Sequence, residues 1–245
     1  MSLTTSDIEN VQKLYPGLKF IEKDGKQYFT GELRFTAFYD ISKDELILNP
    51  LASAASHNDY LTDTFQLEIE FPSDFPLSFP LVREIGGRLK NIADKYSISD
   101  IRDLHVNKNQ NNAVCLCPKP AERLRYPNGV DLLHFINNLV VPFFFGLSYF
   151  DKHRKWPWNE YSHGELGIME FLAECQDKQD GSLAKSCYDA LGEQYKKIVQ
   201  ASKEIKGHWP CLCNSGKKFR SCHGMALKGL WALKQWWKQL NKDRK

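Results

Sequence analysis

The sequence predicts an α+β fold: an antiparallel meander of about four strands flanked by helices, followed by a small segment that carries cysteines and a helix. Three observations predict this arrangement. Apolar and polar residues alternate in two stretches of the first third of the chain (18–40 and 64–71), a broad apolar helix follows a proline-rich turn, and cysteines and lysines gather near the C-terminus. Strands followed by helices are typical of α+β proteins.

The first elements are a short helix and a hairpin. Residues 4–14 begin with Thr, Ser and Asp capping residues, and the helix they predict is stopped by Pro16 and Gly17. Residues 18–40 alternate around Asp24 and Gly25, which predicts a β-hairpin. The clearest strand is 64–71 (TFQLEIEF), because every second residue is apolar.

A proline-rich turn comes next. Residues 71–84 (FPSDFPLSFPLVRE) hold three prolines, so we expect this segment to leave the sheet as a rigid turn and to return near 81–84. The Asn-rich stretch 104–129 then predicts an irregular loop, and a long irregular loop is usually functional. Residues 130–150 predict a helix with a broad apolar face.

Composition restricts the class of protein. The chain has 245 residues, and we find no run of about 18 apolar residues, so no membrane span is expected. The first residues do not resemble a secretory signal, which predicts a cytoplasmic location. In that compartment the seven cysteines are expected to be thiols, metal ligands or nucleophiles rather than disulfides.

A metal site is predicted by the second of two Cys-Leu-Cys tripeptides. Cys211, Cys213, Cys222 and His223 follow the pattern C-x-C, eight residues, then C-H. Four such ligands form a closed tetrahedral set for structural Zn²⁺. A segment this small cannot bury a core of its own, so we expect the metal to supply most of its folding energy.

This pattern resembles the SEC-C motif, named after the C-terminal zinc segment of the secretion ATPase SecA, over residues 207–225. The resemblance implies a docking module. The last 30 residues carry a net charge of +8, and the other 215 sum to −5, which suggests an acidic partner for the basic end. The terminal Trp-rich helix could equally dock onto a partner or cover the zinc segment.

The first Cys-Leu-Cys has different neighbours. His105 and Asn107 precede Cys115, and the order of strand, proline-rich turn, loop, H-x-N, eight-residue step and V-C-L resembles the ubiquitin-conjugating enzyme family over about residues 5–172. The family's stretches read roughly F-P-x-x-Y-P-x-x-P-P, H-P-N and I-C-L. The matching positions in this chain are Phe71, Pro72, Phe75, Pro76 and Pro80 for the turn, and Val114, Cys115 and Leu116 for the last motif.

The resemblance implies that Cys115 carries an acyl group as a thioester. A thiol can attack an activated carbonyl and leave again when an amine arrives. Asn107 takes the family's oxyanion-stabilising position, and His105 is expected mainly to order the loop. Two departures are Val106 in place of the family's proline and a second thiol at Cys117, which could pair with Cys115 or share its acyl group.

Residues 155–171 resemble those of divergent bacterial members encoded in antiphage operons, including cyclic-oligonucleotide (CBASS) systems. That resemblance implies a cGAS-like nucleotidyltransferase as the protein modified or primed. An adenylating partner is also expected, because no phosphate-binding glycine loop is seen. The sequence carries no nucleic-acid-binding signature, so no nucleic-acid partner is expected.

The expected organisation has three parts: a conjugating-enzyme-like catalytic domain (1–172), a helical linker (173–206), and the zinc motif with the C-terminal amphipathic helix (207–245). Two functions remain open at this point. One is a transferase that uses Cys115. The other is a catalytically silent adaptor that keeps the fold for binding and recruits a partner through the zinc motif.

Overall fold

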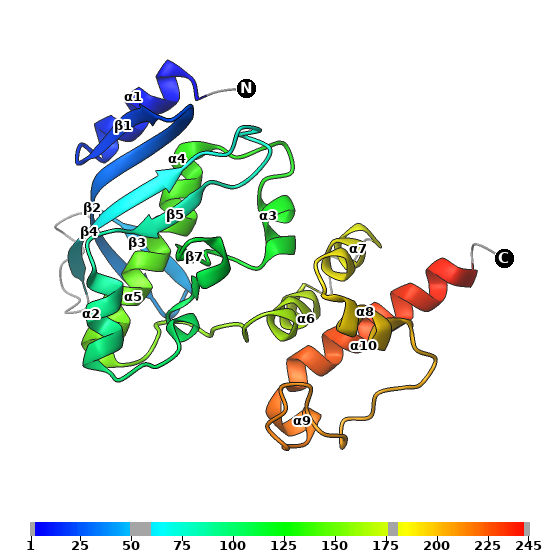
Figure 1. The fold of residues 1–245 in the computed structure, drawn as a ribbon. Coiled ribbons are helices and arrows are strands. Elements are labelled where there is room, and N and C mark those ends of the chain that lie inside the picture. Colours follow the sequence, from blue (N-terminus) through cyan, green and yellow to red (C-terminus); the bar gives the residue numbers. More distant parts are fainter. Residues whose placement is uncertain (1–2, 50–59, 176–180, 243–245) are drawn as a thin grey trace. The chain divides into compact units, whose positions relative to one another are not determined.

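The computed structural model describes residues 3–49, 60–175 and 181–242 (Figure 1). The chain forms two compact units. The first comprises Met1–Leu116 with Asn128–Asn159, and the second comprises Cys117–Pro127 with Glu160–Lys245. This division differs from the expected one, because residues 160–172 fall outside the first unit and the expected linker lies within the second.

The first unit is built on an antiparallel five-stranded sheet with the order β1-β2-β4-β5 and with β3 paired to β2. The α+β class and the antiparallel sheet are therefore confirmed, and β3 adds a strand to the expected four. The helix α1 (Thr5–Leu14) precedes the sheet. The strands are β1 (Leu18–Lys23), β2 (Lys26–Asp40), β3 (Glu45–Leu48), β4 (Leu61–Glu70) and β5 (Leu81–Glu84).

The local predictions in this sheet are confirmed. Lys23 pairs with Lys26 across the β1–β2 turn. The two turn residues, Asp24 and Gly25, both have positive φ (53° and 73°). Two-residue hairpin turns favour Asp and Gly because these residues adopt positive φ more readily than most. The proline-rich segment leaves the sheet after β4 and returns as β5. Its Pro76 carbonyl accepts a hydrogen bond from the Val130 amide (2.8 Å), which ties the turn to the start of the helical region.

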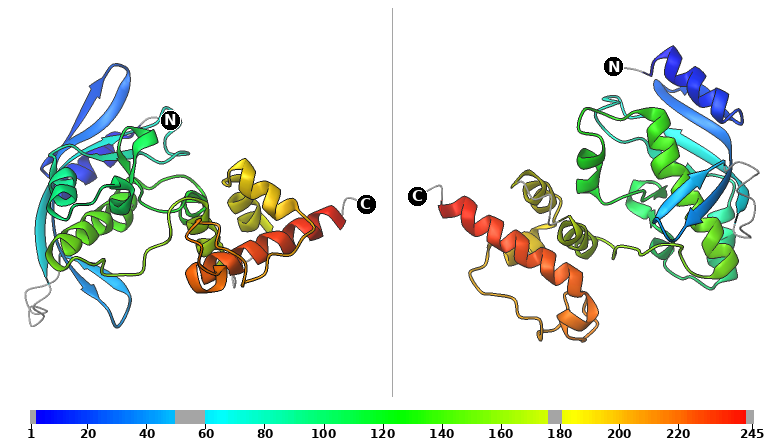
Figure 2. Two further views of the ribbon diagram at one scale, coloured as in Figure 1. Left: turned by 60° about the horizontal axis from the view of Figure 1, so that its bottom comes forward. Right: turned by 180° about the vertical axis from the view of Figure 1, so that it is seen from behind.

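A continuous helical run covers the apolar face of β4. It consists of α4 (Leu132–Phe135), a π-helical turn (Ile136–Val140) and α5 (Val141–His153), and α5 is seen beside the sheet in Figure 2. Phe144 packs on Phe65 of β4 with ring centroids 4.8 Å apart. In the described part of the chain, this run alone is long and apolar enough to cross a membrane, but 67% of its apolar window is buried, as in the core helix of a soluble protein.

A polar network ties three elements of the first unit together. Ser148 of α5 donates a hydrogen bond to Asp63 of β4 (2.6 Å), and Arg88 of α2 (Arg88–Lys95) pairs with the same carboxylate. The Arg88 guanidinium also lies 4.4 Å from the ring centroid of Phe65. Burial alone would raise the pKa of Asp63, but the hydrogen bonds from Arg88 and Ser148 outweigh it and lower that pKa.

The second unit is helical. Its core includes Leu172, Leu183, Val199, Phe219 and Leu230, each at most 5% exposed. Gly229 lets α10 approach α6 closely, because a Cβ there would lie 1.9 Å from the Met169 carbonyl oxygen. The helices are α3 (Lys119–Arg125), α6 (Glu165–Glu174), α7 (Gly181–Asp189), α8 (Glu193–Gln200), α9 (Phe219–Cys222) and α10 (Gly224–Lys242).

A buried lysine closes one end of this core. Lys234 of α10 is 5% exposed, and its ammonium donates to the carbonyls of Ile198 (2.7 Å), Val199 (3.3 Å) and Ala201 (2.7 Å). These carbonyls lie at the C-terminal end of α8, where the helix leaves acceptors unpaired and favours a cation. The apolar face of α10 therefore covers the core of its own unit, while Lys228, Lys238 and Lys242 are exposed.

We predict that Asp63→Asn lowers the free energy of unfolding by about 2 kcal/mol at pH 7, because it removes a charge that holds Arg88 and Ser148. The folded-state pKa of Asp63 is lowered, so its contribution is present above the unfolded pKa of about 3.9 and is lost as the pH falls further. Urea unfolding at several pH values should show the difference from wild type shrinking below about pH 4.

Asp94→Asn is the matched control, because Asp94 is exposed on the same helix as Arg88. A loss of stability equal to that of Asp63→Asn in this control would show that the Asp63 network does not hold the helices to the sheet.

Candidate functional site

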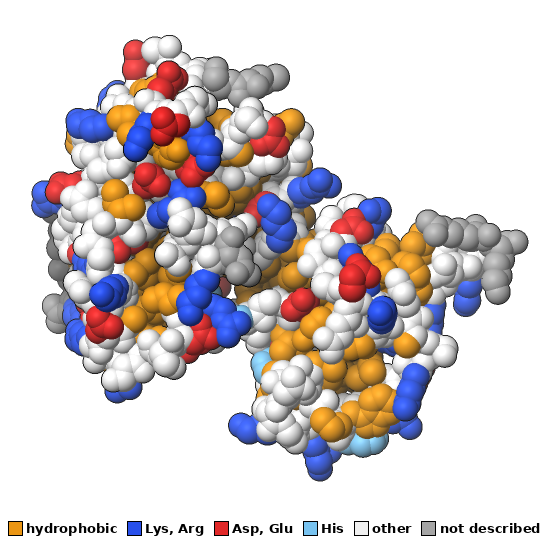
Figure 3. Space-filling view, viewed as in Figure 1, with side chains coloured by type: hydrophobic (Ala, Val, Ile, Leu, Met, Phe, Trp, Pro, Cys, Tyr) orange, Lys and Arg blue, Asp and Glu red, His pale blue; other side chains and the backbone are white. Residues whose placement is uncertain are grey.

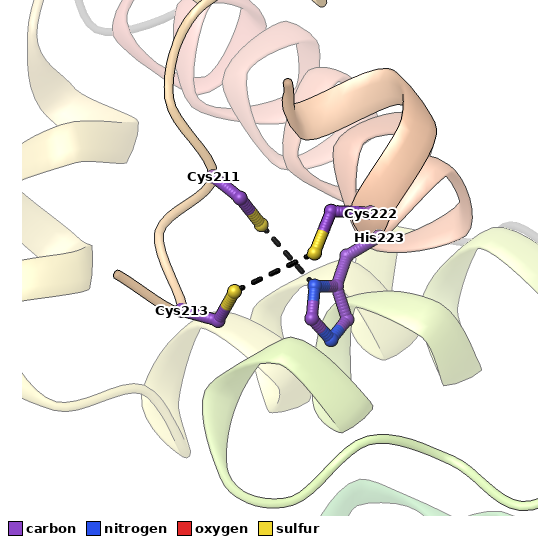
Figure 4. Close-up of side chains that lie close together, drawn as sticks. All are labelled: Cys211, Cys213, Cys222 and His223. Atoms are coloured by element: carbon purple, nitrogen blue, oxygen red, sulfur yellow. Dashed lines mark hydrogen bonds between the residues drawn. The ribbon is translucent and has the colours of Figure 1, made fainter. Parts of the chain in front are cut away.

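Three cysteines and one histidine form a tight cluster in the second unit. The donor atoms of Cys211, Cys213, Cys222 and His223 all lie within 4.8 Å of one another (Figure 4). Cys211 Sγ is 3.2 Å from His223 Nδ1, and Cys213 Sγ is 3.6 Å from Cys222 Sγ. In the described part of the chain, this is the one set of His, Cys, Asp and Glu side chains that gathers closely enough to hold a metal ion.

The spacing of the donor atoms fits a tetrahedral ion. With Zn–S bonds of about 2.3 Å, two sulfurs at tetrahedral positions are separated by about 3.8 Å, and a sulfur and a ring nitrogen by slightly less. The distance between the Cys213 and Cys222 sulfurs, 3.6 Å, agrees with this geometry. The Cys₃His set can therefore hold a metal ion without a ligand from elsewhere.

Backbone turns bring the two ligand pairs together. The Cys211 amide donates to the Lys217 carbonyl (2.8 Å), and Pro210 and Lys218 form a β-bridge. The chain reverses through Asn214 and Gly216, which have φ of 61° and 73°. Left-handed backbone is tolerated best by Asn and Gly, so these residue types allow Cys213 to face back toward Cys222.

The second ligand pair is positioned by a buried phenylalanine. Cys222 ends α9 and His223 follows it, while Phe219 at the start of α9 is fully buried in the core of the second unit. The Phe219 amide donates to the Trp209 carbonyl (2.8 Å), so α9 is also tied to the strand-like segment before Cys211. The ligand segment thus shares a core with α6, α7 and α10, so packing holds it in addition to the metal that the sequence predicts.

One residue near the ligands was missed in the sequence. The Ser215 hydroxyl lies 3.1 Å from Cys213 Sγ and 3.3 Å from Cys222 Sγ. The available signal in the sequence is its place between two predicted ligands. Its hydrogen bonds lower the pKa of Cys213, whereas burial raises that of Cys211. Cysteine binds a metal ion as a thiolate, so binding of an ion to all three cysteines would release the protons of those that are still thiols.

The first Cys-Leu-Cys lies at a short ladder in the first unit. β6 (Val106–Asn107) pairs antiparallel with β7 (Ala113–Val114), with Asn107 opposite Ala113. The Cys115 amide donates to the His105 carbonyl (2.7 Å), which extends the pairing by one step. Side chains alternate along a strand, so Asn107 and Cys115 lie on the ladder face opposite to buried Val106 and Val114.

The structure therefore brings the three predicted residues to one ladder. Cys115 is exposed, and Asn107 and His105 are half-buried. The side-chain amide of Asn107 (Nδ2) donates a hydrogen bond to Gln110 Oε1 (3.1 Å). His105 has left-handed backbone (φ 54°), and its ring packs edge-on against Trp156 with centroids 5.3 Å apart, a contact that orders the start of the ladder.

The two thiols of the first Cys-Leu-Cys have different surroundings. Cys115 belongs to the first unit and is exposed. Cys117 belongs to the second unit, where it is half-buried against the apolar core. Cys117 therefore has the surroundings of a small apolar side chain. Cysteines often occupy such positions as packing residues.

Comparison with known proteins gives one limited similarity. The chain is 37% identical over 71 residues to the protein translocase subunit SecA of Campylobacter hominis, and 34% identical over 56 residues to that of Alcanivorax borkumensis. These matches cover 26% and 23% of this chain but only 8% and 6% of the relatives. No family model and no solved structure matches the chain. The similarity to SecA agrees with the SEC-C resemblance of the cysteine cluster.

Proposed function

We propose that the protein is an acyltransferase of the ubiquitin-conjugating type, which carries a protein C-terminus as a thioester on Cys115 and passes it to an acceptor amine. The observation that supports this most is the exposure of Cys115 at a ladder that also holds Asn107. A buried or metal-bound sulfur could not exchange acyl groups with a macromolecule, and Cys115 is outside the metal cluster.

The chemistry needs two steps. The Cys115 thiolate attacks the donor carbonyl, a new S–C bond forms, and the donor's leaving group departs with the electron pair of its own bond to carbon. An acceptor amine then attacks the thioester, and Cys115 leaves as a thiolate while the amine loses a proton. Both steps pass through an oxyanion, and the Asn107 amide is the donor assigned to stabilise it.

In this proposal the Cys₃His cluster holds a structural Zn²⁺. Four protein ligands leave no open coordination position, so the ion would fix the segment rather than take part in transfer. The zinc segment and the basic surface of the second unit then serve docking. Figure 3 shows Lys and Arg side chains over this unit, and Lys217, Lys218 and Arg220 are exposed beside the cluster.

The proposed setting is a bacterial antiphage system of the CBASS type. There the acceptor would be a cGAS-like nucleotidyltransferase, and a separate adenylating enzyme would activate the carboxyl group. This assignment rests on the resemblance of residues 155–171 and on the missing phosphate-binding loop in the sequence.

The alternative is a silent adaptor that uses the fold and the zinc segment to recruit a partner. Val106 in place of the family's proline supports it, and so does the SecA similarity, because a docking segment requires no catalysis. The two functions differ in whether Cys115 accepts an acyl group and passes it to an amine.

We predict that Cys115 forms an acyl adduct with a short peptide thioester of mercaptoethanesulfonate and that free lysine then removes the acyl group. Cys115→Ala should abolish the adduct, and Cys115→Ser should trap an ester that resists thiols. Asn107→Ala should slow aminolysis about 100-fold, the usual loss for one oxyanion donor. Intact-mass spectrometry over time measures all three.

Asn91→Ala is the control for Asn107→Ala, because Asn91 is exposed on α2. An adduct that survives Cys115→Ala but is lost in Cys117→Ala would move the nucleophile to the other thiol. An adduct on Cys115 that lysine removes equally fast in Asn107→Ala would show that Asn107 does not stabilise the oxyanion, and the absence of any adduct on Cys115 would favour the silent adaptor.

For the metal site, we predict that native mass spectrometry of the full chain detects one zinc ion and that Cys222→Ala abolishes it. The same variant should lower the midpoint of thermal unfolding, because zinc binding contributes free energy only to the folded state. Substitution is preferable to truncation, since Phe219 and Leu230 belong to a core shared with α6.

The matched control for the zinc assignment is Cys115→Ser. It removes an exposed thiol outside the cluster, so this variant should retain the full zinc content. Loss of zinc in Cys115→Ser with retention in Cys222→Ala would place the metal at the first Cys-Leu-Cys.

A further inference from the structure

The distance between Asn107 and Cys115 depends on the turn that joins them. Residues 108–112 connect β6 to β7, and Asn111 and Asn112 both have left-handed backbone, with φ of 52° and 57°. Such a turn is tight, so a change in its path shifts the register of the two-residue ladder. With only two residue pairs in that ladder, the strands alone fix this geometry weakly.

A buried arginine holds this turn from the neighbouring sheet. The Nε of Arg83 in β5 donates to the carbonyl of Asn111 (3.1 Å). Arg83 is only 8% exposed, and β5 lies beside β7. A buried, charged donor aimed at one backbone carbonyl restricts the turn more strongly than a surface contact, because movement of the turn would leave that donor unpaired.

The guanidinium is itself fixed by two carboxylates of β4. Arg83 Nη1 donates to Glu68 Oε1 (3.0 Å) and to Glu70 Oε2 (2.8 Å), and Glu68 lies directly opposite Arg83 in the β4–β5 register. Glu70 also pairs with Lys26 of β2. The planar guanidinium of Arg83 therefore links the main sheet to the turn, because it donates to β4 from one side and to the Asn111 carbonyl from the other. Lysine cannot reproduce this geometry.

We infer that Arg83 is a positioning residue for acyl transfer at Cys115: it anchors the 108–112 turn through the Asn111 carbonyl and so keeps the Asn107 amide in place for the oxyanion. This inference rests on the proposed transferase function. Arg83 acts through the backbone of the turn and Asn107, and no role in contact with the acyl group is assigned to it.

The test uses the full chain and the mercaptoethanesulfonate peptide thioester, with free lysine as the acceptor. Arg83→Lys keeps a cation between Glu68 and Glu70 but loses the donor to Asn111. We expect it to slow aminolysis of the Cys115 adduct about 10-fold, since a small misplacement of a catalytic group is costly. The rate at which iodoacetamide alkylates Cys115 should stay unchanged, because the exposure of the sulfur does not depend on Asn107.

A double-variant comparison separates positioning from general damage. In the Asn107→Ala background, Arg83→Lys should cause no further slowing if Arg83 acts through Asn107. Arg34→Gln, which changes an exposed arginine on β2, should transfer at the wild-type rate. Hydrogen exchange of the 107–115 amides should be faster in Arg83→Lys at an unchanged midpoint of thermal unfolding.

Two outcomes would overturn the inference alone: wild-type aminolysis in Arg83→Lys, or an equal slowing by Arg83→Lys with and without Asn107. Both leave transfer by Cys115 and Asn107 intact. Equal release of the acyl group by wild-type protein and Asn107→Ala would remove the role of Asn107 and the positioning role with it, but not transfer by Cys115. If the wild-type protein forms no adduct on Cys115, or lysine does not remove it, the proposed function itself fails.

Discussion

The alternation of side chains along β4 is the constraint on which the first unit depends. Phe65, Leu67 and Ile69 point into the core, where Phe144 packs on Phe65. Because successive residues of a strand face opposite sides, Glu68 and Glu70 must then lie on the other face. Those two carboxylates hold Arg83, and Arg83 holds the turn between Asn107 and Cys115. A register slip of one residue would remove both the core and the anchor of the candidate site.

The second unit is held together mainly by apolar packing, with the candidate metal cluster at its edge. Phe219 and Leu230 are buried in a core that includes residues of α6, α7 and α8. The hydrophobic effect therefore assembles most of the unit, and the metal ligands close one loop at its edge. Gly229 permits the close contact of α10 with α6, and Lys234 satisfies the carbonyls at the end of α8. An ion at the cluster would fix the 211–223 segment on a scaffold that other contacts already hold.

The repeated Cys-Leu-Cys illustrates how neighbourhood decides the role of a residue. In the second copy, Asn214, Gly216 and the buried Phe219 fold the chain back so that Cys211 and Cys213 meet a third cysteine and a histidine. In the first copy, Cys115 is exposed beside a short ladder of the first unit, while Cys117 belongs to the second unit and packs against the core of that unit. The same tripeptide thus supplies two candidate metal ligands in one place, and one exposed thiol and one packing residue in the other.

Local patterns determined much of this protein directly from the sequence. The Asp24–Gly25 hairpin, the alternating strand β4, the proline-rich excursion and the four clustered ligands all depend on residues close together in the chain, so their spacing was sufficient. The tertiary structure alone decided features that depend on distant residues. Examples are the contact of Arg83 with Asn111, the partial burial of Cys117, and the packing of α7 and α8, which lie in the expected linker, into one core with α10. The spacing of residues along the chain does not predict these contacts. They form only when apolar faces from distant segments pack together and bring their neighbours with them.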